Sequence, residues 1–166
     1  MSRINPEQSV IVFDLDDTLY AEYEYKCSGI RAVAALVAKL YPEFGETELL
    51  EKIDADGNGW LDELCALCNF NSEEKKSLLW YYRLHTPVLT PYWHPQKLAA
   101  FIRRFAAAAL ITDGRSLTQR LKLDALGIRC LFDEILVSES SGQEKPDGGR
   151  FYLLEKKYGM DKRYIY

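Results

Sequence analysis

The segment from Val10 to Tyr20 constrains the fold of this chain more than any other part of the sequence. It reads Val-Ile-Val-Phe-Asp-Leu-Asp-Asp-Thr-Leu-Tyr, so an apolar run ends in three carboxylates within four residues. The apolar run predicts a buried strand over residues 10–14. Like charges at the end of a buried strand repel one another. The cluster is explained if a divalent cation binds there and one carboxylate takes part in chemistry.

The composition of the chain limits the classes of function open to it. Its 166 residues suffice for one domain, or for one domain that carries a smaller insert. Charged residues make up 28% and aromatic residues 13%, so a folded core is expected rather than disorder. The formal net charge is −4 and no basic run is present, which argues against nucleic acid as a partner.

The sequence contains neither a stretch long enough to span a membrane nor a hydrophobic signal before the first strand. We therefore expect a cytoplasmic protein with reduced thiols and without a membrane partner. Cys65 and Cys68 have the spacing of a metal-binding pair, but no second pair follows. Buried structural thiols are the favoured interpretation of these two residues, and a zinc site is the alternative.

Four short segments of the sequence have β character, namely residues 10–14, 107–112, 134–138 and 163–166. Helical patterns over residues 116–126 and 149–158 separate the last three segments, and each pattern is followed by a glycine. Strand, helix and strand at this short spacing predict right-handed crossovers and a parallel sheet. The expected fold class is therefore α/β, with a Rossmann-like parallel sheet.

The stretch between the first two strands is far longer than a crossover requires, and it has helical character throughout. Asn71 and Glu74 have the pattern of a capping box at the start of one of its helices. The simplest interpretation is a helical cap over residues 22–87, inserted into a core formed by residues 1–21 and 88–166. Such a cap would lie near the carboxyl ends of the strands, where open parallel sheets bind ligands.

Asp14 is expected at the carboxyl end of the first strand, with Asp16 two residues further on. A carboxylate can attack phosphorus and form an acyl phosphate. A second carboxyl group can protonate the leaving oxygen and then deprotonate the attacking water. Mg²⁺ prefers oxygen ligands and would offset the repulsion between these carboxylates and an anionic phosphate. The alternative is a surface turn, but turn chemistry alone does not explain three acids after an apolar strand.

Two further segments place polar groups at the carboxyl ends of predicted strands. Thr112 and Asp113 end the second strand, where a hydroxyl and backbone amides can bind phosphate. Lys145 follows the third strand and precedes a proline, which favours extended backbone. Its ammonium could neutralise both phosphate and carboxylate charge. Taken alone, residues 112–113 would be interpreted as an ordinary turn and Lys145 as a solvated surface lysine. A phosphate site is predicted because both segments are expected to meet at one edge of the sheet.

On these residues the chain resembles the haloacid dehalogenase-like (HAD) hydrolase superfamily, over essentially its whole length. The residues from Asp14 to Thr18 resemble the first motif of that family, Thr112 resembles the second, and Lys145 to Asp147 resemble the third. The resemblance implies a Rossmann-like core with a helical cap inserted after the first motif.

The resemblance also implies roles for individual residues. Asp14 would be the nucleophile and Asp16 the general acid/base, with Thr112 and Lys145 binding phosphate; Asp113 is expected to bind phosphate from its place at the strand end. Mg²⁺ would be bound by the Asp14 carboxylate and the Asp16 backbone carbonyl. Asp16 separates the chain from the dehalogenase branch of the family, which lacks an acid at that position.

The activity that these roles imply is a Mg²⁺-dependent phosphatase that hydrolyses a small phosphomonoester through an aspartyl-phosphate intermediate. The alternatives are a phosphotransferase or sugar-phosphate mutase of the same fold, and a catalytically incomplete binding or regulatory module.

The end of the sequence departs from the family pattern. The fourth motif of the family supplies further acidic metal ligands just after the next strand, whereas this sequence ends at Tyr166, within that strand. We therefore expect the C-terminal part of the core to be missing and the phosphatase activity of this chain to be weak or absent. An uncovered strand near Tyr164 is also expected to permit self-association.

Residues 54–62 resemble the start of a calcium-binding EF-hand loop, with acidic or amide residues at loop positions 1, 3, 5 and 9. Cys65 stands where the closing bidentate glutamate should be. A polar turn between two helices is therefore the favoured interpretation, and no bound Ca²⁺ is expected.

Overall fold

The computed structural model describes residues 5–142, 144–159 and 161–166, and it divides into two compact units. The first, here called the α/β unit, comprises Met1–Glu22 and Leu89–Tyr166. The second, here called the helical unit, comprises Tyr23–Val88. The insert expected at residues 22–87 is offset from the helical unit by one residue at each end.

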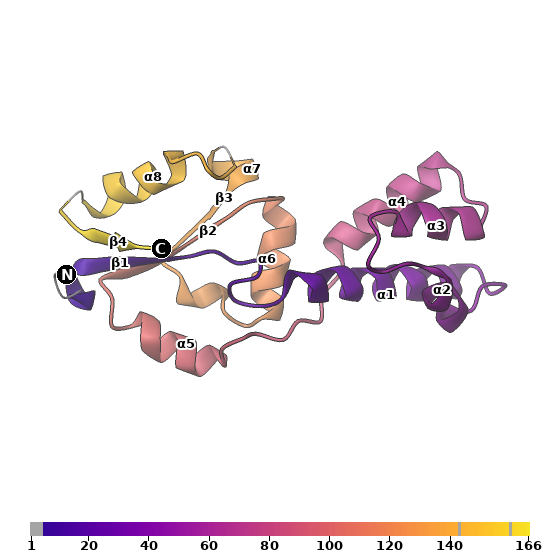
Figure 1. Cartoon of the computed structure of the whole chain (residues 1–166), viewed down its shortest axis with the longest axis horizontal. Coiled ribbons are helices and arrows are strands. Elements are labelled where there is room, and N and C mark those ends of the chain that lie inside the picture. The colour runs from indigo at the N-terminus through magenta and orange to yellow at the C-terminus, as the bar shows by residue number, and fades with distance from the viewer. Residues whose placement is uncertain (1–4, 143, 160) are drawn as a thin grey trace. The chain divides into compact units, whose positions relative to one another are not determined.

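The α/β unit contains a parallel sheet whose described strands follow the order β3-β2-β1-β4 (Figure 1). These strands are β1 (Ser9–Phe13), β2 (Ala107–Thr112), β3 (Glu134–Val137) and β4 (Arg163–Ile165). In the register of the sheet, Val10 of β1 lies opposite Ala107 of β2 and Tyr164 of β4. The prediction of a parallel α/β sheet is confirmed.

Helices cover both faces of this sheet (Figure 1). The longer ones are α5 (Pro95–Ile102), α6 (Ser116–Ala125) and α8 (Gly149–Tyr158). The short ones are α7 (Ser138–Ser141) and the 3-10 helices η1 (Pro6–Gln8) and η2 (Arg129–Leu131). Side chains alternate across a strand, so Val10 and Val12 share one face of β1 and pack in a buried cluster with Leu154 of α8.

Three of the predicted strands are one residue too long at their carboxyl ends. Asp14 lies outside β1, because its carboxylate accepts a hydrogen bond from the amide of Leu15 and turns the chain there. Ser138 begins α7 instead of ending β3, and Tyr166 lies beyond β4. Within the described residues β4 pairs with β1 alone. Self-association through this edge stays a prediction.

The helical unit begins within α1 (Glu22–Leu40) and continues through α2 (Glu46–Lys52), α3 (Trp60–Leu67) and α4 (Ser72–Leu84). The predicted capping box at the start of α4 is confirmed. The Asn71 side chain accepts hydrogen bonds from the amides of Glu73 and Glu74, and the Glu74 carboxylate accepts one from the Asn71 amide.

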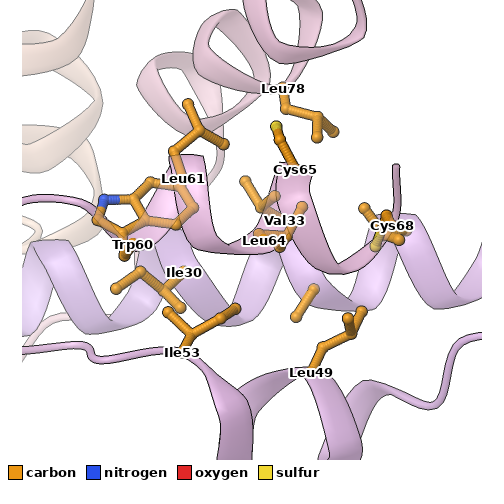
Figure 2. Packing of buried hydrophobic residues seen from close by; sticks show 12 residues of the cluster. Ile30, Val33, Leu49, Ile53, Trp60, Leu61, Leu64, Cys65, Cys68 and Leu78 are labelled. Carbon is orange, nitrogen blue, oxygen red and sulfur yellow. The ribbon is translucent and has the colours of Figure 1, made fainter. Parts of the chain in front are cut away.

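A buried apolar cluster holds the helices of this unit together, with Trp60 and Leu64 of α3 packed against Ile30 of α1 (Figure 2). Cys65 and Cys68 belong to the same cluster, and burial raises the pKa of both thiols. Within the described part of the chain, no three His, Cys, Asp or Glu side chains are grouped as a closed metal site with all-protein ligands would require. The burial of both residues in the apolar cluster supports the interpretation of structural thiols.

In the loop that resembles a calcium site, residues 54–62, oxygen atoms accept hydrogen bonds from other groups of the helical unit. The Lys26 ammonium donates to the carbonyl oxygens of Asp56 and Gly57, at 3.1 and 2.9 Å. The Tyr23 hydroxyl donates to the Asp56 carboxylate, and the Asp56 amide donates to Asp54. A lysine cation thus already interacts with the loop oxygens, which supports the interpretation as a turn.

Among the helices of the described residues, none has the combination of length and hydropathy needed to cross a bilayer.

Candidate active site

The sequence-predicted site residues of the α/β unit meet at the carboxyl edge of its sheet. Asp14 directly follows β1, Thr112 ends β2, and Lys145 lies in the segment after β3 and α7. The Lys145 ammonium donates to Asp14 Oδ2 at 2.6 Å, across 131 residues of sequence. Asp16 and Thr112 are joined through Gln119, whose Nε2 lies 2.9 Å from Asp16 Oδ2 and 2.7 Å from Thr112 Oγ1.

Asp14 is partly exposed, and its two carboxylate oxygens have different partners. Oδ1 accepts the amide of Leu15 at 2.8 Å, and Oδ2 accepts the ammonium of Lys145. The side chain keeps 28% of its surface open. A carboxylate oxygen has more than one lone pair, so both oxygens can still reach a ligand from the open side. This carboxylate is therefore available as a nucleophile or as a metal ligand.

Asp16 differs from Asp14, because both of its carboxylate oxygens are held by buried donors. Oδ1 accepts from the Tyr20 hydroxyl at 2.5 Å and from the Lys122 ammonium at 2.7 Å, and Oδ2 accepts from Gln119. Burial by itself would raise the pKa of Asp16, but these three donors and the charge of Lys122 outweigh it and lower the pKa. The carboxylate is thus held ionised and in one orientation.

Sequence reasoning missed Tyr20, Gln119 and Lys122 as site residues. Gln119 and Lys122 are three residues apart on α6 and so share one face of the helix. Both are buried there, with exposed fractions of 2% and 4%. The sequence offers no sign of this burial, because glutamine and lysine on a helix usually face solvent. Their proximity to the acidic segment depends on how α6 packs.

The carboxylate of Asp113 faces α8 and the Lys145 loop. Its Oδ2 accepts the Lys145 amide at 3.0 Å, and its Oδ1 is bonded to the Arg150 guanidinium. Next to it, the Gly114 amide donates to the Ser138 hydroxyl at 2.9 Å, and Gly114 has a φ of +116° that favours glycine. Any contact between Asp113 and an anion would therefore use its backbone amide rather than its carboxylate.

The oxygen atoms near Asp14 would suit a Mg²⁺ ion that takes only a few of its ligands from the protein. Because the Asp16 carboxylate is occupied by Tyr20, Lys122 and Gln119, Asp16 can offer its backbone carbonyl. Together with the Asp14 carboxylate, that carbonyl would make a hard, all-oxygen pair of ligands. Mg²⁺ characteristically keeps several waters and uses one or two carboxylates plus substrate phosphate. The residues present therefore suit Mg²⁺ rather than a metal that needs a closed protein cage.

A pocket of about 420 Å³ adjoins Asp14 within the α/β unit. It lies along β1, β4 and α5, and its walls are mostly apolar, with Trp93, Leu98 and Phe101 among them. Apolar walls offer no partner for a phosphate group. The groups that could bind an anion, Lys145 and the end of β2, do not line this pocket.

A parallel α/β sheet with a carboxylate–lysine pair and a second, tightly held carboxylate at its carboxyl edge is an arrangement suited to a hydrolase. The comparison with protein families agrees with this assignment. A family model described as "haloacid dehalogenase-like hydrolase" matches residues 8–165, and the chain belongs to this family.

Two archaeal relatives are similar over nearly the whole chain, and both are named glyceraldehyde 3-phosphate phosphatase. The protein of Methanocaldococcus jannaschii is 31% identical over 163 residues, which cover 92% of this chain and 69% of the relative. The protein of Methanopyrus kandleri is 28% identical, with coverage of 90% and 70%.

Solved structures show the same fold at lower identity. The HAD-hydrolase YfnB from Bacillus subtilis, bound to magnesium, aligns with a TM-score of 0.60 and 19% identity, covering 91% of this chain and 72% of that one. A 2-haloacid dehalogenase from Pseudomonas syringae aligns with a TM-score of 0.57 and 20% identity, covering 90% and 72%. At these identities the likeness shows the fold alone, and the site residues must decide the reaction.

Proposed function

We propose that this chain is a Mg²⁺-dependent phosphatase that hydrolyses a small phosphomonoester, such as a sugar phosphate, through an aspartyl-phosphate on Asp14. The observation that carries the proposal is the 2.6 Å contact between Asp14 Oδ2 and Lys145 Nζ, with Asp16 held two residues further on. The names of the two archaeal relatives support hydrolysis of a phosphorylated three-carbon sugar.

Phosphate binding would use the cationic and donor groups at the sheet edge. The Lys145 ammonium, the Thr112 hydroxyl and the Asp113 backbone amide would bind the phosphate oxygens. Thr112 Oγ1 accepts from Gln119 and donates only over 3.5 Å to the Asp113 carbonyl. Because Thr112 is fully buried, its hydroxyl would reach a phosphate oxygen only if the Gln119 side chain moved aside. These groups would offset the charge of the phosphate.

In the first step an Asp14 oxygen would attack phosphorus, and the bond from phosphorus to the leaving oxygen would break. Asp16 would donate a proton to that oxygen. Asp16 is ionised beside Lys122 in the unliganded site, so it would first have to take up a proton from solvent. The negative charge of a bound phosphate would favour that uptake by raising the pKa of Asp16.

In the second step the ionised Asp16 would accept a proton from a water that attacks the aspartyl-phosphate, which releases phosphate and restores Asp14. Mg²⁺, when held by the Asp14 carboxylate and the Asp16 backbone carbonyl, would supply positive charge that offsets the repulsion of the carboxylate and the phosphate. The chain's own residues would supply nucleophile, proton transfer and substrate orientation.

The test is phosphate release from a panel of phosphomonoesters, including glyceraldehyde 3-phosphate, with millimolar Mg²⁺. We expect at most weak release from this chain. A chain extended through the next strand and loop should show release that requires Mg²⁺ and that falls by on the order of a thousandfold or more in Asp14→Asn, because an amide is a far poorer nucleophile. Acid-quenched samples should contain phosphoenzyme in the wild type and none in the variant. Equal release by wild type and Asp14→Asn on every substrate would refute the proposal.

A further inference from the structure

Arg150 is a fully buried cation in the first turn of α8, with an exposed fraction of 0%. Its Nη1 donates to the backbone carbonyl of Thr112 at 2.7 Å, and its Nη2 is bonded to the carboxylate of Asp113. Its Nε has no hydrogen-bond partner among the described residues. The guanidinium therefore lies against the carboxyl end of β2, the strand end where phosphate would bind.

Stability alone does not account for this arrangement. Removing a charged group from water is costly, and a buried ion pair is often no more stabilising than an apolar side chain of similar volume. A buried N–H without a partner adds to that cost. The planar fork of arginine does, however, reach a carbonyl and a carboxylate at once, and it fixes both in direction. Such a contact holds groups in place.

The group that Arg150 holds is connected directly to the proposed nucleophile. Asp113 accepts Arg150 at Oδ1 and the amide of Lys145 at Oδ2, the latter at 3.0 Å. The side chain of Lys145 then extends to Asp14 Oδ2. A continuous series of contacts thus runs from α8 through the end of β2 and the Lys145 loop to the end of β1.

We propose that Arg150 is a positioning residue, which fixes the Asp113 carboxylate and through it the backbone of Lys145, so that the Lys145 ammonium meets Asp14 and a bound phosphate. The proposal rests on the proposed phosphatase function, since it gives Arg150 a part in the same site. Without the guanidinium, the Asp113 carboxylate is free to rotate about its side-chain bonds. The Lys145 amide then loses its acceptor, and the lysine side chain leaves the nucleophile for part of the time.

The test compares three variants of the full chain. Arg150→Met removes the fork and keeps much of the volume, and Arg150→Lys keeps the charge but reaches fewer acceptors. Leu154→Ala is the matched control, because Leu154 lies one turn further along α8, is equally buried, and contributes to the apolar cluster. The readouts are hydrogen exchange of the Lys145 amide by NMR, relative to amides of β1, and the affinity for orthovanadate, a phosphate mimic, with Mg²⁺.

In Arg150→Met we expect the Lys145 amide to exchange about tenfold faster than in wild type, with β1 amides unchanged, and vanadate to bind about tenfold more weakly. Arg150→Lys should recover part of both losses. Leu154→Ala should lower the melting temperature without selective loss at Lys145. Wild-type exchange at Lys145 in both Arg150 variants, or an equal loss in Leu154→Ala, would overturn the proposal.

The two readouts separate this proposal from the proposed function. If neither the wild type nor a chain extended through the next strand and loop binds vanadate or releases phosphate, the phosphatase function is wrong, and exchange at Lys145 still decides whether Arg150 positions the loop. If the wild type is active and Arg150→Met has the same vanadate affinity and catalytic efficiency, Arg150 is not a positioning residue and the function stands.

Discussion

Lys145 Nζ lies 2.6 Å from Asp14 Oδ2, and this contact joins the loop after β3 to the end of β1. Partial burial of Lys145 opposes its charge, but the hydrogen bond and the negative charge of Asp14 outweigh burial and raise the pKa of the ammonium. The charge of Asp14 is therefore compensated before any anion arrives. A phosphate that approaches this site meets a balanced pair rather than a bare carboxylate.

Replacing Lys145 with methionine should weaken phosphate binding at this site. A hydrogen bond to a charged group is worth about 1.5–3 kcal/mol, which corresponds to roughly 10–100-fold in affinity. We expect a loss of this size in orthovanadate affinity, measured by calorimetry with Mg²⁺. Lys97→Met is the control, because Lys97 is exposed on α5 of the same unit. Wild-type affinity in Lys145→Met would show that Lys145 does not bind the phosphate.

Replacing Lys122 with methionine should change the dependence of the rate on the leaving group. Lys122 orients the Asp16 carboxylate. Proton transfer by a carboxyl group such as Asp16 typically contributes about 10²–10⁴-fold to the reaction rate. An alkyl phosphate needs this proton and p-nitrophenyl phosphate hardly does. We therefore expect Lys122→Met to lose about tenfold or more on the alkyl ester and clearly less on the aryl ester.

Leu123→Ala is the control for Lys122→Met, because Leu123 is fully buried on the same helix. It should lower stability and leave the ratio of alkyl to aryl rates unchanged. Equal losses on both esters in Lys122→Met would contradict a role through proton transfer.

Ca²⁺ should not stabilise the helical unit through residues 54–62. Lys26 already binds the carbonyl oxygens of Asp56 and Gly57, and Cys65 cannot replace the closing glutamate of an EF-hand. For the wild type, the melting curve with Ca²⁺ should coincide with the curve with Mg²⁺. The same should hold for Asp54→Ala. A rise in melting temperature that is specific to Ca²⁺ and disappears in Asp54→Ala would show that the loop binds the ion.

His85 should make the stability of the helical unit depend on pH. It is buried, and its Nδ1 lies 2.6 Å from the Tyr82 carbonyl, so Nδ1 donates. Its Nε2 then accepts the Ser28 hydroxyl at 3.1 Å, and Ser28 Oγ accepts the amide of Val88. Burial lowers the pKa of His85 from the ordinary value of 6.5. A second ring proton, on Nε2, would displace the Ser28 hydroxyl hydrogen from this contact, and the Ser28 oxygen would then have to accept both Nε2 and the Val88 amide.

The pKa of His85 in the folded state lies below its value in the unfolded state. The stabilisation that comes from neutral His85 is therefore complete above pH 6.5, and it decreases as the pH falls below 6.5. We expect the melting temperature of the wild type to fall more between about pH 7.5 and 5.5 than that of His85→Gln. His94→Gln, at the start of α5, is the control and should follow the wild type. The same pH dependence in wild type and His85→Gln would exclude His85 as its source.

Local patterns in the sequence were enough to predict the parallel sheet and the capping box at Asn71. They also placed Asp14, Thr112 and Lys145 at strand ends. An apolar run that ends in charge marks a buried strand and its boundary, and parallel strands bring their carboxyl ends to one edge. Errors at the strand ends were of one residue, because side chains such as Asp14 bond their own neighbouring backbone and end the strand early.

The tertiary structure alone decided which polar side chains hold the site together. Lys122 meets Asp16 across 106 residues of sequence, and Arg150 meets Asp113 across 37. Helical periodicity assigns such residues to a face but does not say what that face packs against, and a lysine or an arginine on a helix usually faces solvent. Only the packing of α6 and α8 on the sheet removes these cations from water, and a buried charge is retained where an opposite charge and hydrogen bonds compensate it.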